Sequence, residues 1–134
     1  AGVAVGSQWD AKLTDTPKSE VLTIPKRGRA FSYGLSTLYR GTLGTGQVQS
    51  ARLLARYPDT AYQAHGNYGV QYSLSLPLHN PTKQPQTITL SIQTPLKDDR
   101  NKGGLLFFNP PENRVFFRGP VRIQYTDDSG TVQT

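Results

Sequence analysis

The chain has 134 residues, which fits one domain, and its formal charge of +6 with a pI near 9.8 makes it basic. It contains no cysteine, which excludes disulfides, thiolate metal ligands and cysteine nucleophiles. Thirteen glycines and ten prolines divide it into short segments, so long helices are excluded, and no apolar run reaches the roughly 18 residues that a membrane span requires. We therefore expect a single all-β domain over residues 1–134.

The positive charge is spread along the chain. The one compact basic group surrounds Gly28 and consists of Lys26, Arg27 and Arg29. Clustered cations favour phosphate backbones because their binding releases condensed counterions. Dispersed charge instead predicts a solvated basic surface, and no specific nucleic-acid partner is expected.

Strand patterns in the first half are short and irregular. We predict short strands at residues 3–5, 21–24 and 31–35, with Pro17 and Pro25 as boundaries. Residues 47–57 combine helical spacing of apolar residues with a preceding glycine-rich stretch. We predict a strand there, and one short helix is the alternative.

The glycine-rich stretch itself contains Gly41, Gly44 and Gly46. A P-loop requires a Lys followed by Ser or Thr after its last glycine, because those side chains contact phosphate and magnesium. Gln47 and Val48 stand at those positions. We interpret the three residues as turn glycines.

The loop that follows carries the only candidate ligand-binding residues. An exposed aromatic ring can stack on a sugar or a base, and a loop histidine can bind a ligand. The chain has only two histidines, and no group of carboxylates lies near either in the sequence, so we expect no metal and no cofactor. The candidate residues are Tyr62, His65, Asn67 and Tyr68.

The clearest pattern lies in residues 70–78 and 86–94, where apolar and polar residues alternate. Period-two alternation is typical of half-buried strands in an antiparallel sheet. We predict that the two segments are neighbouring antiparallel strands, and that Pro77 confines the first to a sheet edge. The side chains expected to share one buried face are Tyr72, Leu74, Leu76, Ile88, Leu90 and Ile92.

Residues 98–103 resemble a calcium loop only faintly. Asp99 and Asn101 alternate as oxygen ligands, but Arg100 and Lys102 place positive charge beside the expected cation, and no distal Glu follows. We predict a hairpin loop without a metal.

Three apolar runs in residues 105–125 predict further strands, and residues 127–130 predict a turn before a returning strand at 131–134. Because the sequence ends four residues after that turn, we expect the strand at 121–125 to be incompletely paired. An exposed sheet edge would then be available for pairing with another chain.

The alternating segments together predict an antiparallel β-sandwich, immunoglobulin-like or jelly-roll-like. No Gly-x-Ser-x-Gly elbow is present, and no carboxylate pair has a spacing that singles it out as acid and base. We therefore expect no catalytic residues and no enzyme activity.

Several motifs, distributed over nearly the whole chain, resemble one cyanobacterial family of unknown function. They lie at residues 1–9, 40–47, 57–62, 65–70, 80–82, 93–97, 114–119 and 125–128. The resemblance implies the C-terminal half of a larger protein made with a signal peptide, secreted to the periplasm or the outer cell envelope. It implies no catalytic residues.

Two functions lead, and a hydrolase ranks last, because it requires His65 to meet an acidic residue from a part of the full-length protein outside this chain. The first is a non-catalytic structural or interaction domain of the envelope, and the second is a carbohydrate-binding module that recognises envelope polysaccharide through loop aromatics. The expected partners are therefore an envelope protein or a polysaccharide.

Overall fold

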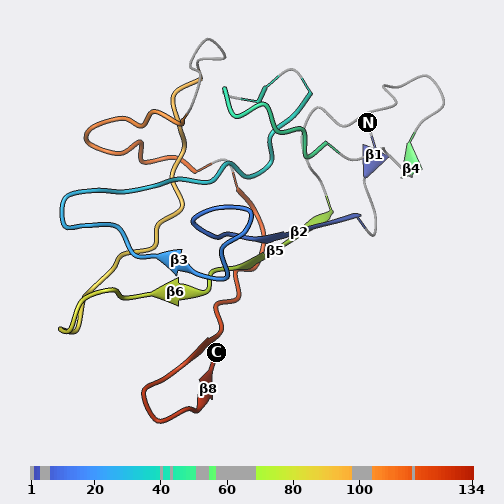
Figure 1. The fold of residues 1–134 in the computed structure, drawn as a ribbon. Coiled ribbons are helices and arrows are strands. Elements are labelled where there is room, and N and C mark those ends of the chain that lie inside the picture. The colour runs from blue at the N-terminus through green and yellow to red at the C-terminus, as the bar shows by residue number, and fades with distance from the viewer. Residues whose placement is uncertain are drawn as a thin grey trace.

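The computed structural model describes residues 2–3, 7–39, 41–42, 44–50, 55–56, 69–97, 104–115 and 117–134. Within these ranges the chain forms short strands and no helix, so the broad all-β prediction is confirmed (Figure 1). The strands are β1 (Gly2–Val3), β2 (Ser7–Lys12), β3 (Leu22–Thr23), β4 (Ala55–Arg56), β5 (Val70–Ser75), β6 (Leu78–His79), β7 (Tyr125–Thr126) and β8 (Val132–Gln133).

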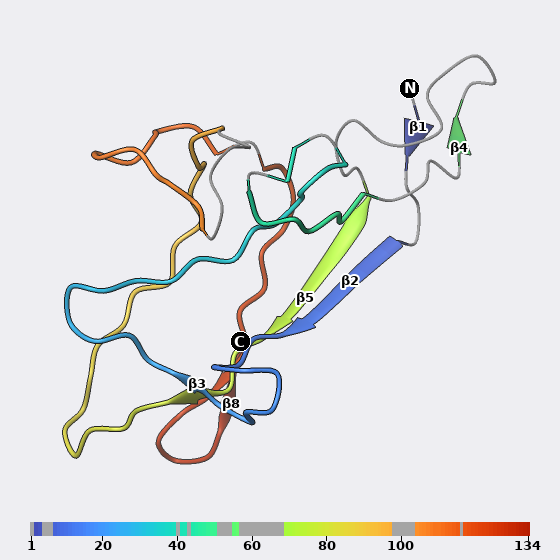
Figure 2. The ribbon, with the colours of Figure 1, turned by 45° about the horizontal axis from the view of Figure 1, so that its top comes forward.

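The strands pair two by two. β1 pairs with β4 and β7 with β8, both antiparallel, whereas β2 pairs with β5 and β3 with β6 in parallel. Figure 2 shows β2 and β5 side by side with their arrows in the same direction. The prediction that residues 70–78 belong to an antiparallel sheet is therefore wrong. Alternation fixes which side chains share a face, but it does not fix the direction of the neighbouring strand.

The two parallel pairs follow each other along the chain, and the loop at 14–21 separates β2 from β3. The Leu13 amide donates to the Ser75 carbonyl at 2.9 Å, and the Leu22 amide donates to the Pro77 carbonyl at 2.8 Å. Between these two bonds, the chain of β5 and β6 advances from residue 75 to 77, whereas the chain of β2 and β3 advances from residue 13 to 22 through the loop. A hydrogen bond from the Asp15 amide to the Val21 carbonyl closes this loop at 2.9 Å.

Residues 86–94 do not form the predicted strand. They contain no strand, and Ile88, Leu90 and Ile92 are 42%, 68% and 48% exposed. In the preceding loop, the Asn80 side chain donates to the Gln84 carbonyl and accepts from the Thr82 amide. The chain does not return from this loop to β5, which pairs with β2 along one edge.

Other predicted strands are shorter than expected or absent. Residues 31–35 form no strand, and in 105–108 only Phe107 makes a bridge, to Pro95. The strand predicted at 21–24 is β3, and the one at 47–57 is represented by β4. Nothing in the described residues supports the alternative of a short helix, although 51–54 and 57 lie outside them.

The C-terminal hairpin confirms the predicted turn. β7 and β8 flank it, and Gly130 has a φ of +80°, which glycine adopts without steric cost. The Asp127 carboxylate accepts hydrogen bonds from the Ser129 amide, the Ser129 hydroxyl, the Thr131 amide and the Gln133 side chain. These bonds lower the pKa of Asp127 to about 2, the Ser129 hydroxyl having the largest effect.

Burial is concentrated in the first half of the chain. Leu22 is 7% exposed, and the polar side chains of Thr37 and Gln49 are 1% and 4% exposed. Gln49 joins two parts of one loop: its side chain accepts from the Thr37 amide and donates to the Gly34 carbonyl. Gly44 and Gly46 have φ values of +80° and +70° in this loop, which confirms their interpretation as turn glycines.

Candidate functional site

The longest paired element of the described structure is the β2–β5 ribbon, and its two faces differ. Side chains at alternate positions of a strand point to opposite faces, and partners in register share a face. The half-buried residues of one face are Trp9, Ala11, Tyr72 and Leu74, and the exposed residues of the other are Gln8, Asp10, Lys12, Gln71, Ser73 and Ser75.

The half-buried face carries a fixed aromatic group. Trp9 stands opposite Tyr72 in the register, and the indole N–H of Trp9 donates to the Tyr33 hydroxyl at 2.9 Å. Tyr33 comes from a segment 24 residues along the chain, so this bond ties that segment to the ribbon. A ring held in this way loses little further freedom when a flat, apolar ligand surface packs on it.

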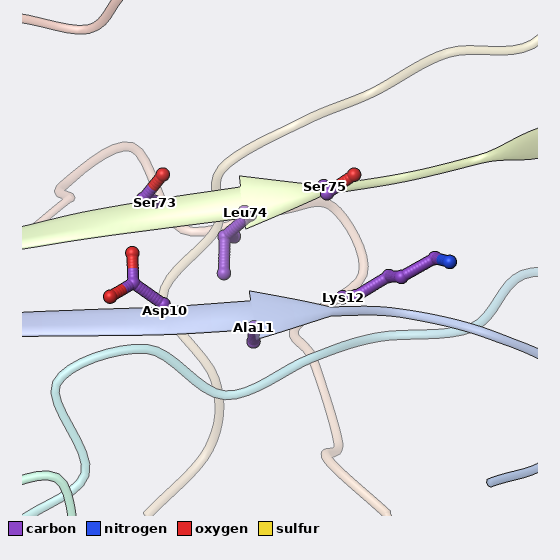
Figure 3. Close-up of a pocket in the computed structure, with 6 residues that line it drawn as sticks. All are labelled: Asp10, Ala11, Lys12, Ser73, Leu74 and Ser75. Carbon is purple, nitrogen blue, oxygen red and sulfur yellow. The ribbon is translucent and has the colours of Figure 1, made fainter.

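A shallow, open hollow of about 350 Å³ lies along the ends of β2 and β5, lined by Asp10, Lys12, Ser73 and Ser75 of the polar face and by Ala11 and Leu74 of the other face. Figure 3 shows the Asp10 carboxylate rising toward Ser73, while Lys12 extends along its strand away from it. The Gln8 side chain donates to the Asp10 carboxylate at 2.7 Å. Donors and acceptors therefore alternate across this face.

The charges at the end of β2 form an exposed ion pair. Lys12 Nζ lies 3.0 Å from Glu20 Oε2, and the two side chains are 52% and 87% exposed. Pairs this exposed contribute little to stability because water screens them. The pair links the loop at 14–21 to the end of β2, and among the described residues Asp10 forms no ion pair.

A second carboxylate stands at the base of this loop. Asp15 accepts a hydrogen bond from the Thr23 hydroxyl at 2.6 Å and one from the Thr23 amide at 2.8 Å. The Thr23 hydroxyl and then its amide lower the pKa of Asp15, with a smaller contribution from the charge of His79. His79 stands opposite Thr23 in the β3–β6 register. This carboxylate fastens β3, which is a structural role.

The chemistry available on the polar face is hydrogen bonding. Amide, carboxylate, ammonium and hydroxyl groups can donate to and accept from the hydroxyls of a polar ligand. Within the described ranges, no three of the His, Asp and Glu side chains gather where they could hold a metal ion. The same part of the chain contains no helix long and apolar enough to cross a bilayer.

The ligand-binding loop predicted from the sequence lies outside the described residues. Tyr62, His65, Asn67 and Tyr68 all fall within 57–68, and Asp98, Asp99 and Asn101 of the loop predicted to bind no metal fall within 98–103. Both interpretations therefore stay predictions.

The residues of the β2–β5 ribbon were missed as a group, although a signal for them exists. In residues 8–13, Trp9, Ala11 and Leu13 alternate with polar residues, which is the same period-two pattern as in β5. The run is short, and its apolar positions include a small alanine, so the pattern is weaker than in residues 70–78.

The family comparison covers the chain from end to end. Residues 1–134 match the family described as "Protein of unknown function (DUF3370)". Neither a search among curated proteins nor a search among solved structures gave a significant match. The description of this family names no activity. Because the match spans all 134 residues, the chain belongs to this family of unknown function.

Proposed function

We propose that this chain is a non-catalytic structural or interaction domain of the cyanobacterial periplasm or outer cell envelope. The observation that carries the proposal is the exposure of large apolar side chains. Among the described residues, Leu90, Ile123 and Tyr125 are 68%, 57% and 59% exposed.

Many large apolar side chains of the described residues are exposed, which supports a role in contact with other molecules. Soluble monomers rarely expose large contiguous apolar areas, and such areas mark interaction sites. The exposed large apolar side chains of the second half include Ile88, Leu90, Ile92, Leu106, Phe108, Phe117, Val121, Ile123 and Tyr125.

The exposed alternating stretches also bear on the architecture that we propose for the domain with its partners. Residues 121–125 alternate between exposed apolar and exposed polar side chains, but only Tyr125 belongs to a strand. If partners or neighbouring segments pair with such stretches, the short sheets, which include the parallel pairs β2–β5 and β3–β6, extend into a β-sandwich. We include this architecture in the proposal.

The compartment rests on the family resemblance given by the sequence motifs. The test is fractionation of cyanobacterial cells, with the intact protein detected by an antibody and its partners recovered after cross-linking. We expect the protein in the periplasmic or outer-envelope fraction together with a defined envelope protein. Recovery in the cytoplasm without a partner would contradict the proposal.

A second candidate is a carbohydrate-binding module, which the aromatic face of the ribbon favours. A sugar presents an apolar face to an aromatic ring and hydroxyls to polar side chains. Trp9 and Tyr72 supply rings on the half-buried face, and the Tyr33 hydroxyl, bonded to the Trp9 indole, supplies a polar group beside them. The loop aromatics Tyr62 and Tyr68 are the further ring candidates from the sequence.

Binding to isolated envelope polysaccharide distinguishes the two candidates. We expect Trp9→Ala, Tyr62→Ala or Tyr68→Ala to weaken binding if the module recognises sugars. Tyr39→Ala is the control, because Tyr39 is 69% exposed and lies outside the ribbon. No binding by the unaltered chain would reject this candidate and leave the first one standing.

A further inference from the structure

Residues 86–94 are a strand segment without a partner. Among the described residues, the segment pairs with no strand, and its backbone amides and carbonyls take part in no hydrogen bond. In Figure 1 it is the gold trace that rises from the loop after β6. Its apolar side chains, Ile88, Leu90 and Ile92, are 42% to 68% exposed. Such an edge is a template for pairing with another strand.

The sequence of this segment is nearly symmetric about Leu90. Read in either direction from Leu90, the residues are a small hydroxyl residue, an isoleucine, a polar Thr or Gln, a second polar Thr or Gln, and a proline. In an antiparallel pair of two copies centred on Leu90, Leu90 faces Leu90, Ile88 faces Ile92, Thr89 faces Ser91, Thr87 faces Gln93, and Gln86 faces Thr94. A two-fold axis requires this kind of self-complementarity, because each copy contributes the same surface.

The charges and prolines around the segment suit a second copy. No charged residue lies between Lys83 and Lys97, so two copies meet there without like-charge repulsion despite the +6 charge of each chain. Pro85 and Pro95 stand at symmetric positions and lack the amide that would extend a ladder. Charged residues that normally blunt an exposed edge are therefore absent from the segment. Lys83 and Lys97 face each other beyond the prolines in this register, and their repulsion limits the pairing to the segment.

We propose that residues 86–94 pair antiparallel with residues 86–94 of a second copy, forming a two-fold β-ribbon centred on Leu90. The ribbon brings Ile88, Leu90 and Ile92 of both copies onto one shared apolar face. This proposal concerns self-association and does not depend on the compartment.

The oligomeric state is the first test. Sedimentation equilibrium of the protein over a concentration series is expected to give a mass of about 30 kDa, twice 14.8 kDa. Leu90→Lys places two ammonium groups opposite each other at the axis and is expected to give a monomer. The control is Leu78→Lys, because Leu78 is 49% exposed but lies in β6, which is already paired with β3.

The second test concerns the register of the pairing. Because the chain contains no cysteine, any disulfide formed by a variant involves the introduced cysteine. Facing residues of an antiparallel pair have Cα atoms about 4.5 to 5.5 Å apart, within the range of a disulfide. Under mild oxidation, Leu90→Cys is expected to form a covalent dimer with itself. In this register, residue 88 of one copy lies about 13 Å along the ribbon from residue 88 of the other, so Ile88→Cys is expected to form on the order of tenfold less covalent dimer. Mixing Ile88→Cys with Ile92→Cys is expected to restore the cross-link.

Three results would overturn the proposal. A monomeric unaltered protein at every concentration would show that another partner, or none, occupies the segment. Equal cross-linking of Leu90→Cys and Ile88→Cys would indicate parallel in-register stacking or collision, because each residue would then meet its own copy. A dimer that survives Leu90→Lys but not Leu78→Lys would place the interface elsewhere. Circular dichroism of each variant distinguishes loss of pairing from loss of fold.

Discussion

Similar alternating sequence patterns are paired and half-buried in the first half of the described chain, and unpaired and exposed in much of the second half. Residues 7–50 with 69–79 contain the parallel ribbon, the buried Leu22 and the buried Gln49. Residues 84–97, 104–115 and 117–134 contain the more hydrophobic alternating stretches, and these are exposed.

Hydrogen-bond partners, more than apolar content, separate the two halves. In the first half, loops are closed by specific side chains such as Asp15 and Gln49. In the second half, such closure is confined to the hairpin around Asp127 and the bond from the Thr94 hydroxyl to the Arg114 carbonyl. An amphipathic strand without a backbone partner within the chain keeps its apolar face exposed until another strand or surface covers it.

Gln49→Ala tests the first half with the largest expected effect. The substitution leaves the Thr37 amide and the Gly34 carbonyl without partners in a buried site, and each such group costs about 1 to 3 kcal/mol. We expect the free energy of unfolding to fall by about 3 kcal/mol in urea titrations. Gln47→Ala is the matched control. An equal effect of both variants would show that the buried bonds do not hold this loop.

Leu22→Ala compares the two halves directly. Leu22 is 7% exposed, whereas Leu106 is 51% exposed. Truncating a buried leucine removes its transfer free energy and leaves a cavity, so we expect a loss of about 2 to 3 kcal/mol. Leu106→Ala is expected to stay within about 0.5 kcal/mol of the unaltered protein. If both variants lose the same stability in thermal or urea denaturation, the contrast between the halves is wrong.

Thr37→Val is expected to raise stability slightly. Thr37 is 1% exposed, and its hydroxyl is buried without a hydrogen-bond partner. Replacing this hydroxyl by a methyl group of similar size removes the cost of burying it, about 1 kcal/mol. The measurement is a shift of the unfolding midpoint to higher urea. Thr45→Val is a useful comparison, because the Thr45 hydroxyl donates to the Thr42 carbonyl at 2.6 Å and its loss should lower stability.

The sequence allowed local features to be predicted better than pairings. The turn at Asp127 and Gly130 and the turn glycines Gly44 and Gly46 were predictable, because a positive φ and a side chain that caps its own turn are properties of a few adjacent residues. The alternation in β5 was visible, and its half-buried face was correctly placed on Tyr72 and Leu74. These features need no knowledge of distant segments.

The partners of each strand could not be predicted in this way. β5 pairs with residues 7–12, and the intervening crossover leaves no trace in the local pattern of either strand. The same alternation in 86–94 produces an unpaired segment, because the loop at Asn80 and Thr82 leads the chain away from β5. The Trp9 and Tyr33 pair of the candidate site joins residues 24 apart, and only the folded chain brings them together.

The C-terminal hairpin is the smallest test of the comparison, because it is the part of the second half that supplies its own hydrogen bonds. The four bonds accepted by the Asp127 carboxylate hold its pKa at about 2, against 3.8 without them. A carboxylate with a lowered pKa in the folded hairpin stabilises it fully above the unfolded value, and this contribution is lost as the pH falls through about 2. We therefore expect the Ser129 and Thr131 amide resonances of the folded hairpin to shift together with a midpoint near pH 2. Asp127→Asn should abolish this shift and loosen the hairpin at neutral pH, because the amide nitrogen cannot accept the Gln133 bond. Asp128→Asn, one residue along the same turn, should leave the shift in place. If Asp128→Asn abolished the shift and Asp127→Asn did not, Asp128 would be the stabilising carboxylate and the prediction would be wrong.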